Sequence, residues 1–175
     1  GLGQGFGLRS IDPVTEAYLD EDSVLEMDTS QIGGVDRTRR ITRGEVGKNA
    51  RLLIRERLFT EKEQIARTDF EVALSGENAG VDLISRSVAR GKSHQEYRSA
   101  IVGDAPCTGH SECDAIIAEE ARVDAAPELK AHHPDASLIH EAAIGKIAGE
   151  QILKLRTLGL TEAEAEAKII EGFLN

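Results

Sequence analysis

The side chains able to do chemistry lie in the second half of the sequence. Cys113 stands in the run Ser-Glu-Cys-Asp, and the adjacent residues His140 and Glu141 follow downstream. A soft thiolate, an imidazole and a hard carboxylate are the ligand types that hold sulfur and iron. A second cysteine, Cys107, precedes Cys113 at a spacing that fits neither a zinc knuckle nor a ferredoxin loop. These four residues form the candidate site, with Cys113, His140 and Glu141 as predicted metal ligands.

Each of these residues also has a purely structural interpretation. Most free cysteines are small buried hydrophobes, and Cys113 fits that description on a strand. His140 would then be a polar residue where the sheet ends, and Glu141 would favour the N-terminus of a following helix through its dipole. A β-turn between Cys107 and Cys113 would bring the two thiols together. The other histidines considered are weaker candidates for a metal role: His110, His132 and His133.

Short segments rich in β-favouring residues, separated by turn residues, fill the middle of the sequence. This alternation is typical of an all-β region, which we place at residues 32–140 after an irregular segment at residues 1–31. The clearest strand candidates are residues 51–55, 70–74, 81–85, 97–102 and 113–118. Glycine-bearing turns are predicted roughly every thirty residues, which favours a solenoid. The glycines are Gly44/Gly47, Gly76/Gly80 and Gly103/Gly109. A β-sandwich would give the same pattern of strands and turns.

The last segment, residues 141–175, has helical spacing instead. Apolar residues recur at intervals of three and four between Ile144 and Leu155, as on one face of a helix. Gly159 is a helix stop, and Thr161 with Glu164 forms a capping box for a second helix. We therefore expect a pair of helices joined by a tight turn.

Composition excludes several classes of function. The formal net charge is −10, which argues against binding to nucleic acid or to an anionic membrane surface. Aromatic residues make up only 3% of the chain, too few for the sugar platforms of a polysaccharide-active β-helix. The sequence shows no signal peptide, long apolar run or disulfide framework, so a reducing cytoplasmic location is expected. It has no phosphate-binding glycine loop either, so any ATP must come with a partner.

An ordered set of short motifs near the C-terminus resembles the SufB/SufD family, the scaffold proteins of iron–sulfur cluster assembly. No single motif is specific, but their order over about sixty residues is. The motifs are Glu112-Cys113-Asp114, His140-Glu141-Ala142, Gly145-Lys146-Ile147, Gly149-Glu150-Gln151, Leu158-Gly159-Leu160-Thr161-Glu162 and Ile169-Ile170-Glu171-Gly172-Phe173.

The resemblance implies a mainly β fold, a right-handed parallel β-helix followed by a C-terminal α-helical pair. It implies a non-enzymatic scaffold on which an iron–sulfur cluster is assembled transiently, with sulfur supplied by a donor protein. In SufB-type proteins the cysteine at the position of Cys113 receives sulfur or ligates the nascent cluster. The histidine matches both SufB and SufD patterns, whereas Glu141 matches SufB alone. SufB-type sequences often carry an acidic residue where this chain has Ile139.

The same resemblance implies particular partners. A SufC-like ABC-type ATPase would dock on the C-terminal helices, and the cluster site would lie in a homodimer or in a SufB–SufD-type dimer. Family members usually have an additional N-terminal helical region and a longer C-terminal tail, so the chain is expected to be a short variant or a fragment.

Two rival functions stay open at this point. The first is a SufD-like interaction subunit without a cluster-binding thiol, in which Cys113 only packs. The second is a thiol hydrolase in which Cys113, His140 and Glu141 act as nucleophile, base and orienting group. The hydrolase requires those three side chains in one hydrogen-bonded chain.

Overall fold

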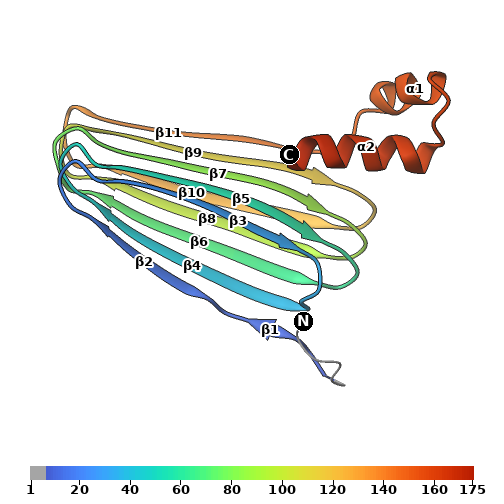
Figure 1. Cartoon of the computed structure of the whole chain (residues 1–175), viewed down its shortest axis with the longest axis horizontal. Helices are drawn as coiled ribbons and strands as arrows, with labels where there is room; N and C mark the ends of the chain where they lie inside the picture. The colour runs from blue at the N-terminus through green and yellow to red at the C-terminus, as the bar shows by residue number, and fades with distance from the viewer. Residues whose placement is uncertain (1–6) are drawn as a thin grey trace.

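The computed structural model describes residues 7–175, which form a long stack of β-strands followed by two helices (Figure 1). Part of the segment predicted to be irregular, residues 1–6, lies outside the described residues. The strands are β1 (Ser10–Ile11), β2 (Val14–Leu19), β3 (Val24–Ile32), β4 (Arg37–Val46), β5 (Arg51–Thr60), β6 (Ile65–Leu74), β7 (Ala79–Ala89), β8 (His94–Gly103), β9 (Cys107–Ile117), β10 (Arg122–Ala131) and β11 (Ala136–Gly145). The helices are α1 (Gly149–Thr157) and α2 (Glu162–Leu174).

The strands form two parallel sheets between which the chain alternates. One sheet, here called sheet A, has the order β1-β4-β6-β8-β10, with β2 also paired to β4. The other, sheet B, has the order β11-β9-β7-β5-β3. Each strand pairs in parallel with the strand one coil of about 28 residues away. This arrangement is a parallel β-solenoid, so the predicted β-helix is confirmed and the sandwich alternative is wrong.

The core between the sheets is built from aliphatic side chains that stack coil upon coil. Period-2 alternation points every second side chain inward, and the parallel register aligns these positions between coils. On sheet B, Leu52 stacks on Val81, and Ile54 stacks on Leu83; these four side chains are almost completely buried. The buried aromatic residues of this core are Phe70 and Tyr97.

Tight turns repeat at the edges of the coils. Residues with left-handed backbone recur at equivalent places, among them Asn49 and Asn78 in neighbouring coils, where asparagine tolerates a positive φ. The Asn78 side-chain amide donates to Oδ1 of Asn49 over 3.0 Å, so the turns are stacked as the strands are. Of the six glycines predicted to mark turns, Gly47 and Gly76 lie between strands. The prediction is wrong for the other four, which lie within strands: Gly44, Gly80, Gly103 and Gly109.

Two predicted boundaries are wrong. Residues 14–32 form β2 and β3 instead of an irregular segment, and both strands pair with the next coil. At the other end, β11 continues to Gly145, so residues 141–145 are strand and not the start of a helix. Parallel pairing with β9 outweighs the weak helical preference of the Ala-rich run there.

The helical pair is confirmed, and its local signals act as predicted. Thr161 caps α2 in a complete capping box with Glu164, and Gly159 has a positive φ of 96° in the connecting turn. Helix α2 packs on β7 and buries Ala165 and Ile170. Helix α1 buries no residue. Within residues 7–175, neither helix has the length and apolar character needed to cross a membrane.

Candidate functional site

The candidate residues come together on the last two strands of sheet B, but on opposite faces. In the register of β9 and β11, Ser111 pairs with His140 and Glu112 pairs with Glu141. Because side chains alternate along a strand, Cys113 and His140 point into the solenoid, whereas Glu141 points to its outer surface. The adjacent pair His140–Glu141 is therefore divided between two environments.

Cys113 lies deep in the core. Its side chain is 1% exposed and stacks between Ser85 and Ala142 of the neighbouring coils. Burial, with smaller contributions from the carboxylates of Glu56 and Asp114, raises the pKa of Cys113 to about 12. In this closed chain, Cys113 is therefore a neutral thiol.

Cys107 does not approach Cys113. Both cysteines point inward from β9, which is continuous from Cys107 to Ile117, so the β-turn considered between them is absent and that expectation is wrong. They are six positions apart along the strand, so their Cα atoms lie about 20 Å from each other. Burial also raises the pKa of Cys107. The two thiols therefore lie in separate environments.

His140 is oriented from inside the solenoid by a chain of hydroxyl groups. Its Nδ1 lies 3.1 Å from Oγ of Ser111, and that oxygen lies 2.7 Å from the Tyr97 hydroxyl and 3.0 Å from the Ser99 hydroxyl. The imidazole also stacks on Tyr97 at 6.4 Å between ring centroids. Burial and the nearby His110 lower the pKa of His140, and Glu141 opposes them. A neutral imidazole held at Nδ1 presents Nε2 as the atom for a ligand.

A buried carboxyl group, Glu56, completes the polar interior. It accepts hydrogen bonds from Thr68 at 2.8 Å and from Ser85 at 3.0 Å, and it is 4% exposed. Burial raises the pKa of Glu56, while these two hydroxyl groups and the charge of Arg40 act in the opposite direction. Glu56 was not among the residues predicted from the sequence, and its only signal there is a charged residue at an inward position of an alternating strand.

Glu56 makes the stability of the solenoid dependent on pH. A carboxyl group with a raised pKa in the folded state binds protons more tightly there than in the unfolded chain. Its contribution therefore decreases as pH rises above the unfolded pKa of about 4.3. We expect Glu56→Gln to remove this decrease, since the amide stays neutral. Urea unfolding of both proteins at a series of pH values measures the difference. A constant difference in unfolding free energy between pH 4 and pH 8 would contradict the assignment.

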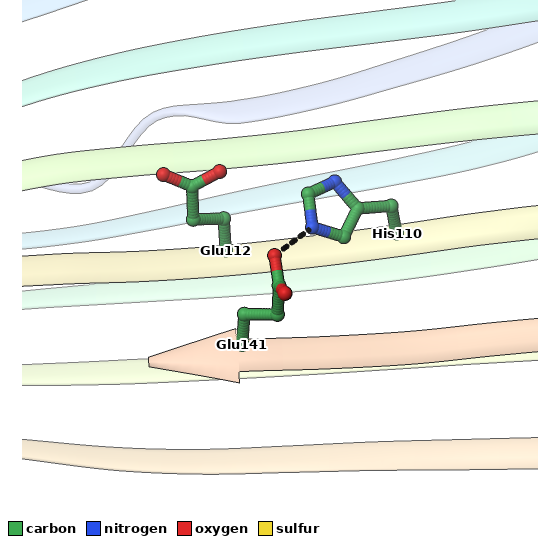
Figure 2. Close-up of side chains that lie close together, drawn as sticks. All are labelled: His110, Glu112 and Glu141. Atoms are coloured by element: carbon green, nitrogen blue, oxygen red, sulfur yellow. Dashed lines mark hydrogen bonds and ion pairs between the residues drawn. The ribbon is translucent and has the colours of Figure 1, made fainter. Parts of the chain in front are cut away.

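The outer face of sheet B carries a second cluster, formed by His110, Glu112 and Glu141 (Figure 2). One potential ligand atom from each residue lies within 4.8 Å of the others. His110 Nε2 is 3.0 Å from Glu141, and His110 Nδ1 is 3.4 Å from Asp82 on β7. A hydrogen bond with Asp114 raises the pKa of Glu112. From the sequence His110 was a weak candidate and Glu112 was part of a motif but not a predicted ligand. Their alternate positions on one strand place them on one face.

The hydrogen-bonded chain required of a thiol hydrolase does not form. His140 bonds to Ser111, Glu141 bonds to His110, and Glu141 and Cys113 lie on opposite faces of sheet B. The described geometry therefore offers no nucleophile–base–orienter chain through these three residues.

The fold and site together define a β-solenoid with candidate metal ligands on its last two coils. A family model described as "SUF system FeS cluster assembly, SufBD core domain" matches residues 13–173. The chain therefore belongs to the SufBD family, whose members take part in iron–sulfur cluster assembly, as the motifs indicated.

Curated relatives from archaea are consistent with this assignment. A protein of Archaeoglobus fulgidus named "Iron-sulfur cluster assembly SufBD family protein" is 37% identical over 131 residues, which cover 74% of this chain and 35% of that protein. The similarly named MJ0034 of Methanocaldococcus jannaschii is 30% identical over 169 residues, which cover 94% of this chain and 52% of that protein. The chain thus spans between about one third and one half of the length of these relatives.

Proposed function

We propose that this chain is a scaffold on which an iron–sulfur cluster is assembled, with SufB-like use of its own thiol. The observation that carries the proposal is that Cys113 on β9 and His140 on β11 both point into the last two coils of a SufBD-family solenoid. Thiolate and imidazole are ligands suited to iron in such clusters. Iron and sulfide are the cargo of this reaction, and the chain itself catalyses no turnover.

The scaffold role requires the last coil to open. Cys113 ligates iron only as a thiolate, and in the closed chain burial keeps it protonated. Strand β11 is the end strand of sheet B and β10 is the end strand of sheet A. Separation of β11 from β9 would admit iron and sulfur to Cys113, and the proton would leave as the metal binds.

A SufD-like interaction subunit is the second candidate. The observation that favours it is the 1% exposure of Cys113, which is what a packing role requires. In this candidate the scaffold chemistry belongs to a partner, and this chain supplies His140 alone.

Either candidate fits a paired assembly. Among the described residues, β10 and β11 each have a strand partner on one side only, so their backbone groups are available to pair with a second chain. A homodimer or a SufB–SufD-type dimer joined there would bring two last coils together. Such pairing would place one chain's Cys113 near His140 of the partner subunit.

Anaerobic reconstitution with iron and sulfide tests the proposed function. The purified protein is expected to develop the ultraviolet-visible absorption and the Mössbauer signature of a bound cluster and to retain both through gel filtration. Loss of all iron and sulfide during gel filtration would contradict the scaffold role.

The C-terminal helices are proposed to dock a SufC-like ATPase, and α1 offers the contact surface. Helix α1 buries no residue, and the apolar side chains Leu153 and Leu158 are 61% and 71% exposed. We expect Leu153→Glu with Leu158→Glu to reduce binding to such an ATPase at least tenfold in a titration. This pair of substitutions leaves the contact between α2 and β7 intact.

A matched control is Val24→Glu, which changes an apolar side chain that is 69% exposed on β3. Val24→Glu is expected to leave binding to the ATPase unchanged. Equal binding by the double variant and the unmodified chain would exclude α1 as the docking surface.

A further inference from the structure

The outer cluster on sheet B has the composition of a metal site distinct from the interior thiol. His110 and Glu112 lie on β9 and Glu141 lies on β11, so parallel pairing of two rigid strands fixes their spacing. One imidazole nitrogen and two carboxylate oxygens form a ligand set suited to divalent first-row metal ions. Three protein ligands leave further coordination positions to water or to an incoming ligand.

The separations of the potential ligand atoms suit a single ion. With metal–ligand bonds of about 2.0–2.2 Å, two ligand atoms on one ion lie at most about 4.4 Å apart. The atoms here lie within 4.8 Å of one another, so small side-chain rotations would close the site. The exposed carboxylate of Glu141 can rotate without disturbing the core.

A second carboxylate orients the imidazole for this purpose. His110 presents Nε2 to Glu141, while Asp82 lies at Nδ1, 3.4 Å away. A carboxylate on one ring nitrogen is the usual partner of a histidine that binds metal through the other. Asp82 comes from β7, so a third strand supports the site from the side opposite Glu141.

We propose that His110, Glu112 and Glu141 bind one divalent first-row metal ion, with Asp82 orienting His110, and that this ion is ferrous iron during assembly. The identity of the metal rests on the proposed function, whereas the existence of the site does not. The backbone of β9 separates this site from Cys113, so the ion binds without the thiol.

Titration of the metal-free protein with Co²⁺, in the absence of sulfide, tests the site. The unmodified chain is expected to bind one equivalent with visible d–d absorption and to melt at a higher temperature when loaded. His110→Gln, Glu112→Gln and Glu141→Gln should each weaken binding at least tenfold. Asp82→Asn should weaken it about tenfold, the lower limit typical of a supporting carboxylate.

Two control variants test whether Co²⁺ binds at this cluster and not elsewhere on the chain. His132 lies 2.7 Å from Asp104 and forms an exposed histidine–carboxylate pair outside the cluster, so His132→Gln should leave the Co²⁺ affinity unchanged. Cys113→Ala should also leave it unchanged. Circular dichroism confirms that each variant is folded before titration.

The inference is overturned if the unmodified chain binds no Co²⁺, if His110→Gln binds it equally well, or if His132→Gln or Cys113→Ala weakens binding as strongly. Co²⁺ binding without cluster formation on reconstitution would contradict the proposed function alone. Cluster formation without Co²⁺ binding would contradict this inference alone.

Discussion

Replacement of Cys113 by alanine is expected to abolish retention of a reconstituted iron–sulfur cluster, with loss of essentially all of its visible absorbance. Cys113 points into the solenoid from β9, on the same side of sheet B as His140 on the paired strand β11, and alanine supplies no soft ligand for iron. The fold should tolerate the change, because a small side chain replaces a small one in a stack that already contains Ser85 and Ala142. Iron and sulfide content after gel filtration, with the absorption spectrum, provides the measurement.

Cys107→Ala is the matched control. It removes the other buried cysteine of the same strand, about 20 Å away along β9, and should weaken cluster retention at most slightly. A Cys113→Ala protein that retains the cluster as well as the unmodified chain would contradict the SufB-like proposal and favour the SufD-like candidate.

The largest loss of stability is expected from Gly76→Ala. A Cβ atom at this position would overlap the backbone of Gly47 and Lys48 in the preceding coil. Backbone of a stacked turn cannot move aside as a flexible side chain can, so the two coils would have to separate. Overpacking of this kind costs about 3 kcal/mol, a large part of the stability of an ordinary domain. Urea unfolding followed by circular dichroism measures it.

Gly145→Ala is the control for this substitution. No heavy atom lies within 4 Å of the Cβ that it would add at the end of β11, so the change in unfolding free energy should stay within about 1 kcal/mol. Equal changes in unfolding free energy for the two substitutions would show that close stacking of the turns does not restrict the size of the side chain at position 76.

The β-solenoid was predictable in outline because strands and turns leave local signals in the sequence. Its two ends were misassigned because their strand structure depends on pairing with the neighbouring coil. Short runs of β-favouring residues in β5 and β7 indicated strands, and glycines such as Gly76 indicated turns. Strands β2 and β3 were missed because the acidic residues around Asp20 are typical of an irregular segment. The two strands nevertheless form one more coil of the stack. Residues 141–145 suit a helix by themselves, and only pairing with β9 makes them a strand.

The candidate ligands could be proposed from the sequence, but their geometry could not. Cys113, His140 and Glu141 were chosen for their chemistry, and their sides of the sheet depend on the register of β11 against β9. Once that register is known, period-2 alternation places Glu141 with His110 outside and leaves His140 with Cys113 inside. Buried groups such as Glu56 give no chemical motif, and only three-dimensional structure identifies them.

Because strands pair coil by coil, the number of coils in the solenoid can change without changing the surroundings of the candidate ligands. Each strand pairs only with strands one coil away, so a coil inserted before β4 would leave every neighbour of Cys113 and His110 in place. Each added coil would move the far end of the stack by about 4.8 Å, the spacing between paired strands. The number of coils therefore sets the distance between the first coil and the ligands carried by the last two coils.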